Sequence, residues 1–116
     1  MFVRLNILVF TVFFITPSFS AELSVEDYIE HKNSVRYDHY LYGLESGLDW
    51  ANDYIFQKNN TQIFCKPNDL ELSSVQLRKF IDIELEQNFS FYDKYRDAPL
   101  LGLALRNAYI DNFPCN

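Results

Sequence analysis

Few residues in this chain have the types and the spacing that catalysis or metal binding requires. The two histidines, His31 and His39, are eight residues apart, and a pair alone is too few ligands for a zinc site. No glycine-rich phosphate loop occurs, and no strained turn exposes a nucleophilic serine. Glu45 and Asp49 could exchange protons as an acid–base pair, but carboxylates one helical turn apart usually form a solvated helix face. The sequence therefore predicts a non-enzyme without a catalytic residue, a metal or a cofactor.

The first twenty residues have the pattern of a secretory signal peptide. Arg4 is followed by an apolar run of eleven residues from Leu5 to Ile15, and small residues precede Ala21. That run is too short to span a bilayer of about 30 Å. We expect cleavage after Ser20 or one residue later. The mature chain, residues 21–116, is then a single exported domain with no membrane segment.

The two cysteines, Cys65 and Cys115, predict a disulfide bond. Export places the chain in an oxidising compartment, where two cysteines in a small domain are usually bridged. The bridge would close a loop of about 50 residues, which is worth on the order of 4 kcal/mol of stability. The alternatives are two free thiols or a bridge between two molecules.

The mature chain is acidic. Without Arg4 it has nine Lys and Arg against sixteen Asp and Glu, a net charge of −7. This charge argues against nucleic acid and anionic membranes as partners and suits a basic protein partner. The alternative is that the acidity only keeps the protein soluble.

The sequence predicts an all-α fold. Glycine and proline are too rare for a sandwich of many short strands. The expected helices are 25–32, capped by Ser24; 35–57, capped by Asn33 and Ser34; 75–89, capped by Ser73 or Ser74; and 99–113, capped by Asp97. Loops are expected at 58–72 and 90–97. The alternating piece FIDIELE could form a strand, but its many Lys, Glu and Gln neighbours favour a helix.

The helix 35–57 has the clearest pattern. Its apolar stripe consists of Tyr37, Leu41, Leu44, Leu48, Ala51 and Ile55. Beside that stripe run Asp38, Tyr42, Glu45, Asp49 and Asn52 at the same spacing. Gly43 and Gly47 each cost about 1 kcal/mol of helix propensity, so we expect another element to pack closely there, either within the monomer or in a dimer.

Aromatic residues are frequent, and some lie where a partner could contact them. Tyr92 and Tyr95 fall in the expected loop 90–97, and tyrosine is favoured at protein interfaces. The alternative is that most of the tyrosines complete a small core.

Three segments together resemble a known family. They are YLYGLESGLDWAN, IFCKPNDLELSSVQL and a last apolar helix that closes on NFPC. They resemble the bacterial Rap/Tai immunity proteins, periplasmic partners of the peptidoglycan amidase effectors that type VI secretion delivers. The resemblance covers residues 24–115. The matching residues are Gly43, Gly47, Phe64, Cys65, Pro67, Gln76, Phe113, Pro114 and Cys115.

The resemblance implies a small HdeA-like bundle of about four helices with one disulfide, often a homodimer, in the periplasm. Characterised relatives bind a cognate amidase and block its active-site cleft. By this resemblance the chain is an immunity protein, and the guessed contacts are Asp38, Glu45, Asp49, Tyr92 and Tyr95. The alternatives are an HdeA-like acid-stress chaperone, in which protonation of carboxylates exposes apolar surface, or another non-enzymatic periplasmic binding protein.

Overall fold

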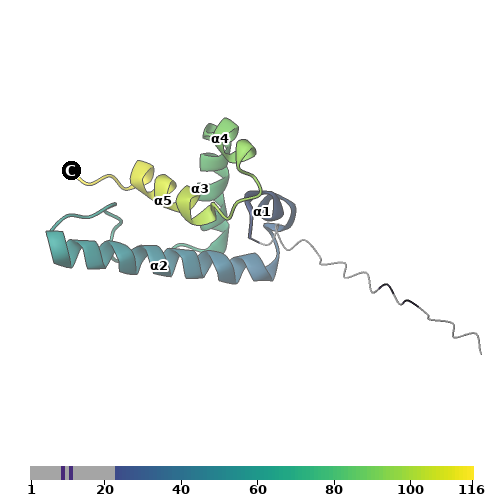
Figure 1. The fold of residues 1–116 in the computed structure, drawn as a ribbon. Helices are drawn as coiled ribbons and strands as arrows, with labels where there is room; N and C mark the ends of the chain where they lie inside the picture. Colours follow the sequence, from purple (N-terminus) through teal and green to yellow (C-terminus); the bar gives the residue numbers. More distant parts are fainter. Residues whose placement is uncertain (1–8, 10, 12–22) are drawn as a thin grey trace, which may run out of the picture.

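The computed structural model describes Val9, Thr11 and residues 23–116, and this part of the chain forms five helices and no strand (Figure 1). The helices are α1 (Val25–His31), α2 (Val35–Asn59), α3 (Ser74–Gln87), α4 (Phe89–Lys94) and α5 (Leu101–Asn112). The predicted all-α class is confirmed, with one helix more than expected. The predicted signal peptide lies outside the described residues, apart from Val9 and Thr11.

The long helix α2 forms one side of the molecule, and α3 and α5 pack against it and against each other (Figure 1). The short helix α1 lies at the start of α2, and α4 continues from the far end of α3. No helix within residues 23–116 is long and apolar enough to cross a membrane.

Serine side chains start the first three helices, as the sequence predicts. The Oγ atom of Ser24 accepts a hydrogen bond from the backbone N–H of Asp27 at 3.0 Å, and Ser34 caps α2 in the same way. Ser73 forms a capping box with Gln76 at the start of α3. The piece FIDIELE lies inside α3, so the helical prediction is confirmed over the strand alternative.

The segment before α5 differs from the prediction. Asp97 does not cap a helix, Pro99 is not in a first turn, and α5 begins only at Leu101. The reason is a contact with α1. The carbonyl of Ala98 accepts a hydrogen bond from the N–H of Val25 at 3.2 Å, and the carbonyl of Arg96 accepts one from the N–H of Glu26 at 3.0 Å. These carbonyls satisfy the free donors at the start of α1 instead of continuing a helix.

The expected loop 90–97 contains α4, which the sequence reasoning missed. Tyr92 anchors this helix, because its side chain is buried and its hydroxyl donates a hydrogen bond to Glu84 at 3.0 Å. Burial, followed by the Glu84 carboxylate, raises the pKa of Tyr92 to about 12. A six-residue helix is therefore held by its contact with α3 and not by its own propensity.

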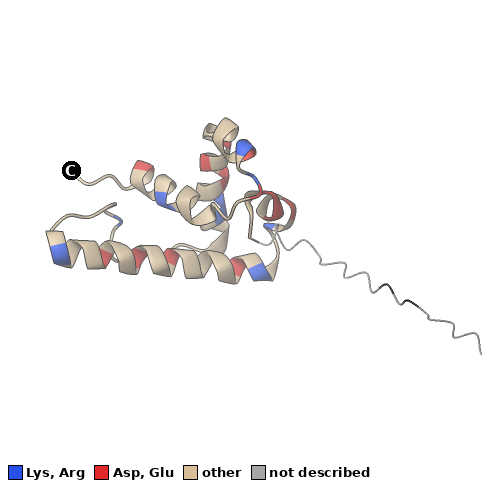
Figure 2. Cartoon of the chain, in the orientation of Figure 1, with Lys and Arg blue, Asp and Glu red and all other residues tan. Residues whose placement is uncertain are grey.

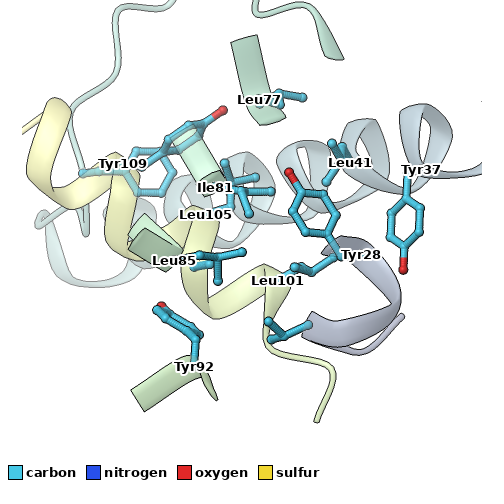
Figure 3. Packing of buried hydrophobic residues seen from close by; sticks show 13 residues of the cluster. Tyr28, Tyr37, Leu41, Leu77, Ile81, Leu85, Tyr92, Leu101, Leu105 and Tyr109 are labelled. Atoms are coloured by element: carbon cyan, nitrogen blue, oxygen red, sulfur yellow. The ribbon is translucent and has the colours of Figure 1, made fainter. Parts of the chain in front are cut away.

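All five helices and Phe64 from the 60–73 segment contribute to the core. The core residues are Val25, Tyr28, Tyr37, Leu41, Phe64, Leu77, Ile81, Leu85, Tyr92, Leu101, Ala104, Leu105 and Tyr109, most of which Figure 3 labels. Some tyrosines belong to the core and others do not: Tyr28 and Tyr37 are buried in it, whereas Tyr42 and Tyr54 are exposed.

The apolar stripe of α2 is buried only over its first half. Tyr37 and Leu41 are fully buried, Leu48 and Ile55 are half-buried, and Ala51 is exposed. Ala51 belongs to the predicted apolar stripe but is exposed, so the stripe extends beyond the buried part of α2. The C-terminal half of α2 thus keeps most of its surface open.

The two glycines of α2 do not mark close packing within the monomer. A Cβ atom at Gly43 or Gly47 would meet no atom within 4 Å, so that prediction is wrong. Both glycines line a shallow hollow of about 430 Å³ between α2 and α5. The two helices approach instead at Gly102, where a Cβ would lie 3.4 Å from Leu44 Cδ2. A contact between two copies at Gly43 and Gly47 stays a prediction.

The predicted disulfide is present. Cys65 and Cys115 are bonded, and the backbone N–H of Cys65 also donates to the carbonyl of Phe113 at 2.8 Å. The bridge and this hydrogen bond tie the chain after α5 to the segment between α2 and α3.

Candidate functional site

The residue after the bridged cysteine, Lys66, joins the 60–73 segment to two carboxylates of α2. Its Nζ atom lies 3.1 Å from Glu45 Oε1 and 2.8 Å from Asp49 Oδ2, and it stands 5.4 Å from the centre of the Tyr109 ring. The side chain of Lys66 is only 9% exposed. Burial alone would lower the pKa of Lys66, but Asp49 and Glu45 outweigh that effect and raise it, so the ammonium stays charged.

Asn52 holds the backbone that precedes Lys66 against α2. This buried amide accepts a hydrogen bond from the N–H of Ile63 at 2.7 Å and donates to the carbonyl of Phe64 at 2.9 Å. An irregular segment needs such partners when its backbone is buried. The spacing of α2 places Asn52 on the polar flank and does not reveal this role. The one signal for it is an uncharged amide within an otherwise acidic and aromatic row.

Two polar atoms next to this cluster are buried in the described part of the chain, close to each other but without a hydrogen bond of full geometry. They are Oε2 of Glu45 and the hydroxyl of Tyr109. Burial, followed by the nearby Glu45 carboxylate, raises the pKa of Tyr109. Lys66 is therefore the charge that makes a largely buried Glu45 tolerable at this position.

A polar cleft of about 750 Å³ opens between α2 and the 62–76 segment. Its charged lining consists of Glu45, Asp49, Asp53, Glu71 and the single cation Lys66. Four carboxylates against one ammonium leave the cleft with a net negative charge. Such a cleft attracts a cationic group and repels an anionic one.

The outer wall of the cleft continues onto the exposed side of α2. A second, shallower hollow there is lined by Tyr42, Glu45, Ser46, Asp49, Trp50 and Asp53. We call this hollow, together with Tyr54 beside it on α2, the acidic–aromatic face. Trp50 is 71% exposed, and Tyr54, one turn further, is 62% exposed. Figure 2 shows acidic residues along the middle of α2 and basic residues near its two ends. Rings and carboxylates thus alternate on a rigid helix.

The structure brings together only two of the five predicted contact residues. Glu45 and Asp49 meet at the cleft, whereas Asp38 pairs with Arg78 of α3, which lowers the pKa of that carboxyl. Tyr92 is 2% exposed, so the prediction that its side chain contacts a partner is wrong for this conformation. Tyr95 is 44% exposed, but it follows α4 and lines neither the cleft nor the acidic–aromatic face.

The histidines do not belong to a metal cluster in the described part. His31 Nε2 lies 3.9 Å from Asp27 and 3.7 Å from Glu30, and both contacts are on the surface of α1. Within residues 23–116, no three His, Cys, Asp or Glu side chains gather in a way that could hold a metal ion.

Comparison with known proteins adds no relative: no family model matches the sequence, and no curated protein or solved structure matches it either.

Proposed function

We propose that this protein is an exported, non-enzymatic inhibitor that binds one basic protein partner through the cleft and the acidic–aromatic face of α2. The partner class that the motif resemblance suggests is a peptidoglycan amidase toxin delivered by type VI secretion. In that case the protein is a periplasmic immunity protein that works by covering the toxin's active-site cleft.

The observation that carries the proposal is the exposure of large aromatic side chains between carboxylates. Trp50 and Tyr54 leave most of their surface in water, although burial of a large apolar side chain is worth about 1.5–3 kcal/mol. Tryptophan and tyrosine dominate the binding energy of many protein interfaces. A cluster of both beside Asp49 and Asp53 has the composition of an interface for a basic partner.

The way this surface is held also favours binding. The wall opposite α2 is fixed by the disulfide, by Asn52 and by Lys66, so the cleft exists before a partner arrives. A pre-formed surface loses little conformational entropy on association. Its negative charge would speed the encounter with a basic partner and make it sensitive to salt.

A capture experiment tests the proposal. The oxidised mature chain serves as bait against the periplasmic and secreted proteins of its source at pH 7, with the charge-neutralising variant Asp49→Asn beside it. We expect one dominant hydrolase, retained less by the variant. Glu86→Gln, on the exposed part of α3, is the matched control and should retain as much as the wild type.

The second candidate, an acid-stress chaperone, is supported by two carboxylates with lowered pKa values. Asp27 accepts a hydrogen bond from Tyr37, and Asp38 pairs with Arg78, so these groups join α1 to α2 and α2 to α3. Acid would break both links. The same capture repeated near pH 3 separates the two functions: many unrelated proteins held only in acid would favour the chaperone and count against the inhibitor.

A further inference from the structure

We infer that the acidic–aromatic face of α2 binds arginine or lysine side chains of the partner, with their cationic groups held between the Trp50 and Tyr54 rings and the Asp49 and Asp53 carboxylates. The inference deepens the proposed function, on which the identity of the partner rests. The chemistry of the surface can be tested without that partner.

The chain itself supplies two related contacts of cations with side chains of α2. The ammonium of Lys66 lies between Glu45 and Asp49 and over the Tyr109 ring. The ammonium of Lys58 stands 5.6 Å from the centre of the Tyr54 ring. Two carboxylates of this half of α2 therefore hold one ammonium and the Tyr54 ring holds another, whereas the ring over Lys66 belongs to α5.

The spacing of the side chains forms two parallel rows. Asp49 and Asp53 are four residues apart, and so are Trp50 and Tyr54, so each row follows one line along the helix surface. Both Asp49 and Asp53 border the shallow hollow that Trp50 lines. A cationic side chain lying between the rows would meet a ring on one side and a carboxylate on the other.

A guanidinium group fits this arrangement better than an apolar or an acidic side chain does. Arginine stacks on aromatic rings through its flat face and donates hydrogen bonds to carboxylates from its edge. Lys66 contacts only one oxygen of Asp49, and Gln57 contacts only one oxygen of Asp53. An apolar partner would therefore remove the other carboxylate oxygens from water without pairing them, which is costly. An acidic partner would be repelled by a chain that already carries an excess of carboxylates.

Trp50 allows a direct test, because it is the only tryptophan in the chain and lies in the middle of the face. The oxidised mature protein is titrated with a short peptide of alternating arginine and glycine while tryptophan fluorescence is recorded. We expect saturable binding that weakens with added salt, and no binding of the matching glutamate–glycine peptide. Failure of the arginine peptide to bind, or equal binding of both peptides, would overturn the inference.

Two variants localise the binding, and a third controls for general loss of aromatic surface. Asp53→Asn and Tyr54→Ala should each weaken binding of the arginine peptide by about two- to fivefold. Phe89→Ala removes a 65% exposed ring on α4 and should bind like the wild type. If the two α2 variants bind as tightly as the wild type, the peptide binds elsewhere and the inference is wrong.

The same variants separate this inference from the proposed function. If the mature chain captures a hydrolase that Asp53→Asn and Tyr54→Ala retain fully, the inhibitor function stands and the assignment of this face fails. If the arginine peptide binds as expected but no hydrolase is captured, the face is a cation-binding surface and the inhibitor function fails.

Discussion

Removal of the disulfide should lower the free energy of unfolding by about 4 kcal/mol. Cys65 and Cys115 are separated by 50 residues, and the bridge restricts the unfolded chain over this loop. In the chain-entropy model a loop of this length corresponds to about 14 cal/mol/K, which is about 4 kcal/mol at 25 °C. Small domains have total stabilities of about 5–15 kcal/mol, so the bridge supplies a large share.

The experiment compares the mature wild type with the double variant Cys65→Ala, Cys115→Ala in urea, followed by circular dichroism of the helices. With a slope of about 1–2 kcal/mol per molar urea, the midpoint should fall by about 2–4 M. The slope itself should rise, because an unfolded chain without the bridge exposes more surface. Wild-type protein treated with a reductant is the control and should match the double variant.

A loss below about 1 kcal/mol, with an unchanged slope, would refute the reasoning. It would mean that the unfolded chain still holds residues 65 and 115 close together, so that the bridge removes little freedom. The effect of the bridge would then lie in the folded state, in the backbone contact between Cys65 and Phe113.

Three further changes test the site and the helices. Lys66→Met leaves Glu45 without its cation and should cost about 2–4 kcal/mol in urea unfolding, less than a fully buried pair because Asp49 is 42% exposed. Gly47→Ala should stabilise the protein by up to about 1 kcal/mol in thermal unfolding, because a Cβ there meets no atom. The pKa of Asp27 in the folded state lies below its ordinary 3.8, so its contribution to stability is complete above about pH 5 and is lost as the pH falls. When unfolding is measured from pH 7 to 2, the free energy of unfolding of Asp27→Asn should therefore decline less steeply than that of the wild type.

Each of these expectations has a contradicting result. For Lys66→Met it is a loss no larger than that of Lys79→Met, which removes an exposed lysine of α3. For Gly47→Ala it is a lower melting temperature, which would indicate a contact at this glycine that the monomer does not contain. Parallel pH curves for wild type and Asp27→Asn would show that this carboxyl has no linkage to folding.

Local signals in the sequence were sufficient for most of the helices. Ser24, Ser34 and Ser73 start helices because a serine hydroxyl can satisfy an N–H three residues later without any help from the rest of the fold. The disulfide was predictable because a chain with two cysteines allows only one intramolecular pairing. These features depend on neighbours in sequence or on a single possible partner.

The features that were missed depend on contacts between distant segments. Helix α4 forms because Tyr92 reaches Glu84 on α3, and the start of α5 is displaced because Ala98 bonds to α1. At the candidate site the sequence placed Glu45 on the flank of α2 but gave no reason to pair it with Lys66. That pairing requires the 60–73 segment to fold back along α2. The periodicity of apolar residues predicts helices but not the path of an irregular segment.

The placement of the bridge also sets an order of events during biosynthesis. Cys115 follows Cys65 by 50 residues, so the sulfur atoms can meet only after α3, α4 and α5 have been made. Until then the segment that carries Lys66 is held against α2 only by Asn52 and by the pairing of Lys66 with Glu45 and Asp49. The covalent closure of the cleft is therefore a late event, whereas the acidic–aromatic face belongs to α2 alone and is present as soon as that helix has formed.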